Sequence, residues 1–363
     1  MKVAVIGGGV IGLSTALTLA DRGHEVSVFD PAPLSGASWH AGGMLAPTAE
    51  VVYKQEPLFP LMNAAASYYP ALIELVSKYT DSPTGYRTEG TLVVARDCAD
   101  NTHLEELRQY QSLHGMEVER LTSRQARSLE PALAPSLAGA VSIQGDHQVQ
   151  PRLFTRALLD ACAAAGVTIT RRAVDDVTDV DAGVGADQVL IAAGLGASAI
   201  TGWYEGENPL VLRPVYGDII HVRVPEHQYP LVTRVIRGFV EDRPIYLIPR
   251  EDRTLTIGAT TREDGREAPA VQGVYQLLRD AIEVCPALEE CDFVEADAGA
   301  RPGSPDDLPY LGRVNERVVV STGYFRHGIL LTGMAARCGA DLVEGIDPPL
   351  SLESCDPMRH RRN

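Results

Sequence analysis

The sequence predicts a mixed fold, α/β together with α+β, in which an antiparallel-sheet domain is inserted into a Rossmann-like dinucleotide-binding domain. Three observations predict this fold. A strand, a glycine-rich turn, a helix and a second strand follow one another over residues 1–30. Alternating apolar runs separated by charged turns occupy residues 211–259, as in antiparallel strands. A strand, a turn and a helix return over residues 318–344, so the dinucleotide-binding domain is discontinuous in the sequence.

The N-terminal segment carries the strongest signal. The apolar strand 2–6 leads directly into a glycine-rich turn, and the strand after the next helix ends on Asp30. Gly7 allows the tight turn, Gly9 lets the backbone approach a pyrophosphate, and Gly12 lets the helix lie close to the sheet. The N-terminus of that helix offers free N–H groups and a partial positive charge to the phosphates. Asp30 is placed to accept a hydrogen bond from a ribose hydroxyl.

Composition narrows the function classes. A formal net charge of −16 argues against nucleic acid and anionic membranes as partners and fits a soluble small-molecule enzyme. The glycines at the N-terminus interrupt any signal-peptide helix, and no segment approaches the length of a transmembrane helix, so we expect a cytoplasmic protein. The six cysteines form no CxxC pair, which predicts reduced thiols and neither a metal site nor a disulfide framework.

The remaining elements follow from periodicity and turn residues. Helical patterns cover residues 58–79, 104–114, 151–165, 271–284 and 329–344, and Thr122 begins another helix. Strands are predicted at residues 87–96, 167–171, 187–191, 212–224, 232–240, 244–249, 254–259 and 318–322. We assign residues 1–50, 140–205 and 298–345 to the dinucleotide-binding domain, 51–139 and 206–297 to the inserted domain, and 346–363 to a tail.

Three further segments carry a family resemblance. They are the loop SGASWHAGGMLAP at 35–47, the segment ARPGSPDDLPYLG at 300–312 and the segment STGYFRHGILLT at 321–332. Together with the N-terminal turn, in this order, they resemble the D-amino-acid-oxidase-like family of FAD enzymes over residues 1–345. Within the family, the sequence is most similar to the branch that oxidises glycine in bacterial thiamine biosynthesis.

The resemblance implies a reaction. It implies non-covalent FAD and the oxidative deamination of glycine, and of small amines such as sarcosine or D-alanine, to the imine or glyoxylate. O2 would be reduced to H2O2, and the glycine imine would supply thiazole synthesis, with a hand-off to thiazole synthase and a homo-oligomer as expected associations.

The resemblance also implies a set of FAD contacts. Gly42 and Gly43 would let a loop run against the flavin, Met44 would cap the ring, and Val174 would contact the adenine through its backbone. The turn 328–330, at the start of the last helix, would direct N–H groups at the flavin edge that gains negative charge on reduction. The predicted FAD contacts are Gly7, Gly9, Val10, Ile11, Gly12, Asp30, Pro31, Ala37, Ser38, Gly42, Gly43, Met44, Val174, Gly194, Tyr324, Phe325, Arg326, His327, Gly328, Ile329 and Leu330.

The substrate site is predicted from the need to hold a carboxylate. The guanidinium fork suits this task because it donates to both oxygens at once, and the resemblance places the anchor at Arg301, between a strand and a turn. Tyr246 matches the family tyrosine that donates to the same carboxylate, and Arg326 matches an arginine beside flavin and substrate. The histidines His40, His147, His221 and His327 are interpreted as structural. Residues 243–245 lack the histidine that can occur near this point, which leaves the pocket wall open.

Two alternatives remain at this stage. One is an oxidase or dehydrogenase for D-amino acids, or a sarcosine oxidase, with the same fold and a different pocket. The other is a non-oxidising FAD- or NAD-binding protein, for example an RNA-modifying or regulatory one, although the acidic charge argues against RNA. The electron acceptor, O2 or another molecule, and the number of subunits stay open as well.

Overall fold

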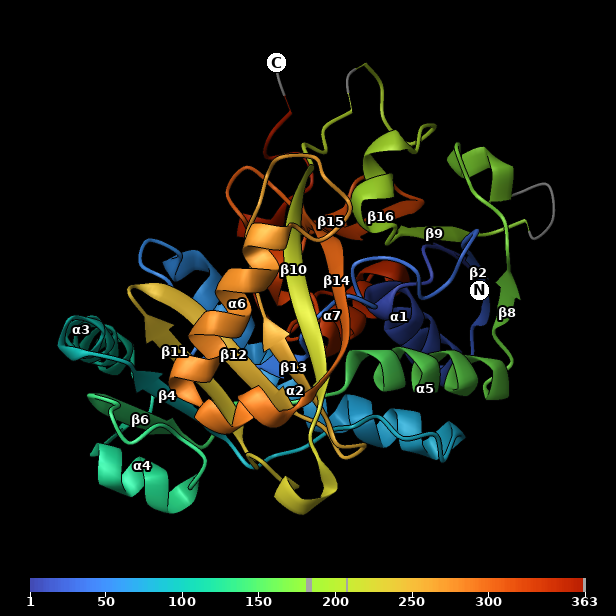
Figure 1. Ribbon diagram of the computed structural model, residues 1–363. Coiled ribbons are helices and arrows are strands. Elements are labelled where there is room, and N and C mark those ends of the chain that lie inside the picture. Colours follow the sequence, from blue (N-terminus) through green and yellow to red (C-terminus); the bar gives the residue numbers. More distant parts are fainter. Residues whose placement is uncertain (181–184, 207, 362–363) are drawn as a thin grey trace.

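The computed structural model describes residues 1–180, 185–206 and 208–361. Its first sheet has the strand order β15-β16-β9-β1-β2-β8 (Figure 1). These strands are β1 (Lys2–Ile6), β2 (Glu25–Phe29), β8 (Thr168–Thr170), β9 (Gln188–Ile191), β15 (Tyr310–Arg313) and β16 (Val318–Thr322). All neighbours in this sheet pair in parallel except β15 and β16. The Rossmann-like sheet built from distant segments of the chain is therefore confirmed.

Helices pack against this parallel sheet, in the case of the second one named through the other helices. They are α1 (Val10–Asp21), α2 (Phe59–Tyr79), α5 (Pro151–Ala164) and α7 (Thr332–Glu344). Helix α1 contacts α5 and α7, and α2 packs against the same two helices. Leu13, Leu17, Phe154 and Met334 from these helices are fully buried in one core with strand residues such as Val3. Helix α2, expected in the inserted domain, thus shares a core with the dinucleotide-binding helices, whereas the predicted domain boundaries stay a prediction.

The second sheet has the order β14-β10-β13-β12-β11-β4-β6-β5. Its strands are β4 (Thr91–Ala95), β5 (Glu119–Leu121), β6 (Gly139–Ile143), β10 (Arg213–Arg223), β11 (Val235–Val240), β12 (Arg243–Pro249), β13 (Thr254–Gly258) and β14 (Asp292–Gly303). Pairing is antiparallel throughout except between β11 and β4. A short antiparallel pair, β3 (Met44–Leu45) and β7 (His147–Gln148), lies outside both sheets.

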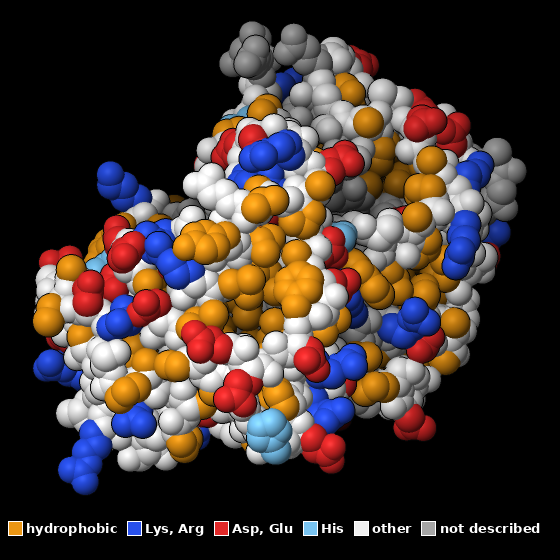
Figure 2. All heavy atoms as spheres, in the orientation of Figure 1, with side chains coloured by type: hydrophobic (Ala, Val, Ile, Leu, Met, Phe, Trp, Pro, Cys, Tyr) orange, Lys and Arg blue, Asp and Glu red, His pale blue; other side chains and the backbone are white. Residues whose placement is uncertain are grey.

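Three helices accompany the second sheet. Helix α6 (Val271–Val284) packs against β10 to β13 over a second apolar core. Helix α3 (Cys98–Leu113) contacts β4 and β6, and α4 (Ser123–Leu129) contacts β5 and β6 and begins with a capping box formed by Thr122 and Gln125. On the face that Figure 2 shows, hydrophobic side chains gather over α6 and β10, and acidic and basic side chains are interspersed around them. No helix of the described part of the chain is long and apolar enough to cross a membrane.

Several elements differ from the sequence-based expectation, among them the unpredicted strands β5, β6 and β15 and the earlier start of α3 at Cys98, and two of the differences bear on the site. Strand β14 was not predicted, because its acidic and glycine-rich sequence DFVEADAGARPG has low strand propensity; Arg301 lies inside it, not after a strand. The last helix begins at Thr332 instead of Ile329, since residues 325–327 form a short 3₁₀ turn first. Pairing with β10 over its full length stabilises β14 despite its composition.

Candidate active site

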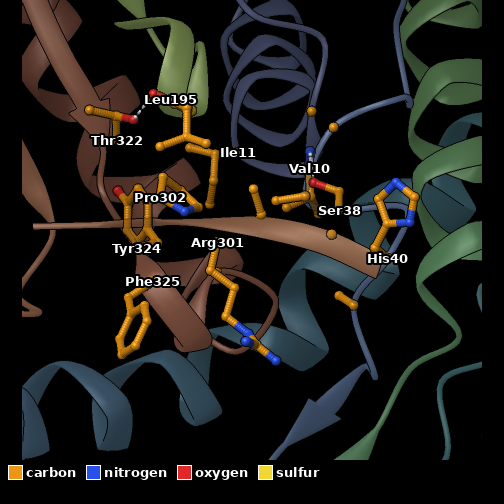
Figure 3. Close-up of a pocket in the computed structure, with 18 of the residues that line it drawn as sticks. Val10, Ile11, Ser38, His40, Leu195, Arg301, Pro302, Thr322, Tyr324 and Phe325 are labelled. Atoms are coloured by element: carbon orange, nitrogen blue, oxygen red, sulfur yellow. Dashed lines mark hydrogen bonds between the residues drawn. The ribbon is translucent and has the colours of Figure 1, made fainter. Parts of the chain in front are cut away.

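One cavity of about 830 Å³ lies between the two sheets. At one end its wall contains Asp30 and Val174, beside the parallel sheet, and at the other end it contains Tyr246 and Arg301 from the antiparallel sheet. Figure 3 shows part of this wall, with Val10 and Ser38 on one side and Arg301 and Phe325 on the other. A single ligand can therefore extend from the glycine-rich turn to the second sheet.

The turn before α1 has the close backbone packing that a dinucleotide cradle needs. Gly7 has a φ of +118°, and a Cβ there would overlap the carbonyl oxygen of Ala192 on the neighbouring strand. A Cβ at Gly12 would overlap the carbonyl oxygen of Gly7, so α1 can lie this close to the turn only because position 12 is glycine. Gly9 caps α1 without a side-chain hydrogen bond, which leaves the helix N-terminus to a ligand.

Two side chains order this cradle. The Asp30 carboxylate accepts hydrogen bonds from the N–H of Gly8 (2.6 Å) and of Ala32 (2.8 Å). An ionised carboxylate offers about four lone pairs, so Asp30 keeps capacity for a ribose hydroxyl. The N–H of Val10 donates to Ser38 Oγ (3.1 Å), which brings the loop 35–38 onto the start of α1. The residues present at this end of the cavity fit the ADP half of FAD.

The loop 42–44 continues the wall toward the second sheet. Gly43 has a φ of +90°, and a Cβ at Gly42 would lie 2.9 Å from the hydroxyl oxygen of Tyr246. Arg250, which is 4% exposed, donates to the carbonyl oxygens of Gly42 and Val149 and so fixes this loop. Burial lowers the pKa of Arg250 to about 10, so it remains a cation at neutral pH. The sequence pattern did not single out Arg250, because an arginine at a strand end has no distinctive spacing.

At the end of the cavity formed by the second sheet, large polar side chains lie over glycines of neighbouring strands. Arg301 on β14 extends over Gly217 on β10, where a Cβ would lie 2.5 Å from its Cζ atom. Tyr246 on β12 extends over Gly258 on β13, where a Cβ would lie 2.5 Å from its Cζ atom. Because β10 and β13 are neighbours, the two glycines let the guanidinium and the phenol reach toward each other across the sheet.

The charges at this end suit a carboxylate ligand. Arg301 donates one hydrogen bond, from Nη1 to the carbonyl oxygen of Thr260 (3.3 Å), and within the described residues it has no carboxylate partner. Burial lowers the pKa of Arg301, but an arginine side chain stays cationic at neutral pH even when it is buried. Burial also raises the pKa of Tyr246 to about 12, against the opposing effect of Arg301, so the phenol is a donor at neutral pH.

A second charged pair lies in the same wall and was missed from sequence. Glu50 forms a very short ion pair with Arg237 on β11 and lies 3.7 Å from Nδ1 of His327. Burial would raise the pKa of Glu50, but Arg237, His327 and Arg326 hold it at about 2. The pair joins the loop after Met44 to the second sheet and to the 3₁₀ turn 325–327. Glu50 and Arg237 are 187 positions apart, so no local pattern could reveal them.

The cavity gathers most of the predicted site residues. Its wall includes Gly7, Gly9, Val10, Ile11, Asp30, Pro31, Ala37, Ser38, Gly42, Gly43, Met44, Val174, Gly194, Tyr246, Arg301, Tyr324, Phe325, Arg326, Gly328 and Ile329. Gly12, His327 and Leu330 do not line it. Gly12 lies against the turn, the buried His327 faces Glu50, and Leu330 packs in the core around α1 and α7.

The histidines divide into two groups. His40 lines the cavity (Figure 3), and its Nδ1 lies 2.7 Å from the carboxylate of Asp297 on β14. His147, His221 and His327 do not line it. Burial lowers the pKa values of His221 and His327 to about 4, so both are neutral at pH 7.

The fold and the cavity define the class of the protein as a dinucleotide-dependent oxidoreductase. The chain matches the DAO family, described as FAD dependent oxidoreductase, over residues 2–342 and belongs to this family. The family, the fold class and FAD as the cofactor, all predicted from sequence, are thereby confirmed.

Individual relatives agree with this placement. The chain is 34% identical to the glycine oxidase of Geobacillus kaustophilus, over 99% of this chain and 97% of that protein. The crystal structure of glycine oxidase from the same organism superposes with a TM-score of 0.88 at 32% identity, covering 99% of this chain and 100% of that one. The chain is also 31% identical to the bifunctional protein ThiO/ThiG of Trichormus variabilis, over 96% of this chain but only 54% of that longer protein.

Proposed function

We propose that the protein catalyses the oxidative deamination of glycine, and of small amines such as sarcosine and D-alanine, with O2 reduced to H2O2. One observation carries the proposal most directly. The guanidinium of Arg301 faces the cavity without a carboxylate partner among the described residues, and Tyr246 approaches it from the neighbouring strands. A cationic fork with a phenol donor beside it is suited to an amino-acid carboxylate.

The residues would share the work as follows. Arg301 and Tyr246 would hold the carboxylate and so fix the position of the α-carbon. Gly42 and Met44 would close the cavity over the reacting atoms and exclude water, and Arg326 would line the side that faces the 3₁₀ turn. FAD, when bound, supplies a two-electron acceptor. The substrate loses two hydrogens to become the imine, water converts the imine to glyoxylate and ammonia, and O2 takes up the two hydrogens as H2O2.

The cavity also supports an assignment of the cofactor contacts. We propose that the turn 7–12, Asp30 and the loop 37–38 hold the ADP half, that Val174 lies at the adenine, and that Gly42 to Met44 and residues 324–330 surround the flavin. The support is their position along one continuous wall. Gly12, His327 and Leu330 would act from behind this wall.

We further propose that the imine is passed to thiazole synthesis. The bifunctional protein ThiO/ThiG of Trichormus variabilis carries a region similar to this chain within a protein of about twice its length, which supports a functional link to a second enzyme. Self-association and location in the cytoplasm also remain predictions from the sequence.

The test is reduction of the holoenzyme by a panel of amines without oxygen, followed by an H2O2 assay in air. We expect glycine, sarcosine and D-alanine to bleach the flavin absorbance, bulky D-amino acids to do so more slowly, and L-amino acids to leave it unchanged. A preference for D-phenylalanine or D-lysine over glycine would indicate a general D-amino-acid oxidase. Bleaching by no amine at all would indicate a protein that binds FAD without this chemistry.

A further inference from the structure

Phe325 has an unusual backbone at the edge of the cavity. Its φ is +46°, in the left-handed region that bulky side chains rarely adopt. It opens the 3₁₀ turn Phe325–His327, directly after Tyr324. A bulky residue persists in such a conformation only when its surroundings hold it there, and such residues cluster at functional sites. The question is therefore what holds Phe325 and what the ring does there.

Two guanidinium groups hold the ring. Cζ of Arg213 lies 5.7 Å from the ring centroid of Phe325, and Cζ of Arg326 lies 5.4 Å from it. Both distances are within the range of cation–π attraction. Arg213 is itself fixed, because it pairs with Asp307 (2.8 Å) and Glu263 (3.5 Å) and donates a very short hydrogen bond to a backbone carbonyl of the β14–β15 loop. The ring is thus contacted from the side of β10 by a side chain that has several polar partners of its own.

The same strand serves the substrate anchor. Arg213 and Gly217 are four positions apart on β10 before its bulge, so they share one face of the strand. Gly217 gives room to Arg301, whereas Arg213 fixes Phe325. Phe325 and Arg301 line the same cavity, and in Figure 3 both side chains extend to the same side of β14. The ring of Phe325 and the guanidinium of Arg301 therefore face the same cavity.

We propose that the ring of Phe325 is the wall that limits the size of the substituent on the substrate α-carbon, and that Arg213 is the positioning residue that holds this wall. The inference rests on the proposed function, since it concerns a substrate whose carboxylate is bound by Arg301. A hydrogen in place of a side chain on the α-carbon then leaves the fixed ring undisturbed. A larger substituent must displace a ring that two guanidinium groups and a left-handed backbone hold in place.

The first experiment compares substrates. Phe325→Gly removes the ring and tolerates the positive φ, whereas Phe325→Ala removes the ring and keeps the backbone penalty. In both variants we expect the ratio of kcat/KM for D-leucine to that for glycine to rise by about tenfold or more. The matched control is Phe293→Ala, which removes an exposed phenyl from the same strand as Arg301. A ratio equal to that of the native enzyme in both Phe325 variants overturns the proposal.

The second experiment does not need turnover. Acetate and benzoate are titrated into the oxidised holoenzyme, and their dissociation constants are read from the flavin absorbance. The ratio of benzoate to acetate affinity is expected to rise in Phe325→Gly by about tenfold. If the native enzyme oxidises no amine but the affinity ratio rises in Phe325→Gly, the proposed function is wrong and the role of Phe325 is supported. If glycine is oxidised and neither the kcat/KM ratio nor the affinity ratio changes, the role of Phe325 is wrong and the proposed function is supported.

The third experiment tests Arg213. Arg213→Gln removes the cation over the ring, and Arg213→Lys keeps the charge without the planar group that stacks on it. Both variants are expected to raise the ratio of benzoate to acetate affinity, as Phe325→Gly does. The rise should be smaller for Arg213→Lys than for Arg213→Gln. Because Arg213 acts through the ring, the double variant should shift no further than Phe325→Gly alone. A lower unfolding temperature with an unchanged ratio would make Arg213 merely structural.

Discussion

The guanidinium of Arg301 lies directly over the backbone of Gly217, so that a Cβ at position 217 would lie 2.5 Å from its Cζ atom. These residues belong to neighbouring strands, β14 and β10, which pair along the whole of β14. The absence of a side chain at 217 thus decides where the cation of Arg301 can lie. Gly217 thus positions the proposed carboxylate anchor.

The first prediction follows from this contact. Gly217→Ala should push the guanidinium of Arg301 away from its position and weaken carboxylate binding by about tenfold, close to 1.4 kcal/mol. The measurement is the KM for glycine, with the dissociation constant of acetate from flavin absorbance as a second value. Gly145→Ala is the control, because a Cβ there meets open space. Native affinity for acetate in Gly217→Ala would contradict the prediction.

A second prediction concerns the anchor itself. Arg301→Ala removes the bidentate partner of the carboxylate, which should cost about 2–5 kcal/mol and lower kcat/KM for glycine by well over tenfold. Arg301→Lys should recover little, because an ammonium cannot donate in parallel to both oxygens. The flavin spectrum should persist in both variants. Near-native oxidation of glycine by Arg301→Ala would show that another residue binds the carboxylate, and Arg326 would be the next candidate.

The parallel sheet could be predicted from sequence because its signals are local. The turn 7–12 needs glycine for reasons that involve only adjacent residues and one neighbouring strand, such as the contact between Gly7 and Ala192. Strand β14 could not be predicted in this way. Its stability depends on pairing with β10, about 80 positions away, and not on its own residues.

The site residues likewise include some that could be predicted from sequence and some that could not. Arg301 stands in a segment that resembles a known family, and Tyr246 matches a tyrosine of that family, so both could be named. Glu50, Arg237 and Arg250 lie in segments with no such pattern, and they meet the cavity through contacts between distant parts of the chain. Gly217 and Gly258 were missed for a related reason, because a glycine inside a strand reveals its use only when the side chain above it is known.

A third prediction addresses the cofactor cradle. Alanine is the better helix former, so Gly12→Ala would stabilise an ordinary helix. Here its Cβ would overlap the carbonyl oxygen of Gly7, and overpacking of this kind typically costs about 1–3 kcal/mol. We expect α1 to shift and most of the FAD to be lost on gel filtration. A native ratio of FAD to protein in Gly12→Ala would show that the helix can move without opening the cradle.

The fourth prediction is that FAD is held without a covalent bond. A thiolate is the reactive form of cysteine, and burial raises the pKa of Cys338 to about 12 and that of Cys355 to about 11. Within the described residues no cysteine lines the cavity. Acid precipitation should therefore release the yellow flavin into the supernatant. Flavin that stays with the denatured chain would contradict the prediction.

The last prediction is a pH dependence of stability that is traced to one histidine. Burial, with Arg152 nearby, lowers the pKa of His221 in the folded protein to about 4, whereas an unfolded histidine titrates near about 6.5. Between these values the unfolded chain binds a proton that the folded protein does not. The free energy of unfolding therefore falls as the pH falls through this window, by at most about 3 kcal/mol for this group. Below about pH 4 both states bind the proton, and this group lowers the free energy of unfolding no further.

Urea unfolding of the holoprotein at several pH values should show a free energy of unfolding that depends less on pH in His221→Gln than in the native protein. His227→Gln, which changes a side chain that is 72% exposed, is the control and should leave the slope unchanged. A native slope in His221→Gln would assign the acid sensitivity to other groups, with the buried His327 the first to test.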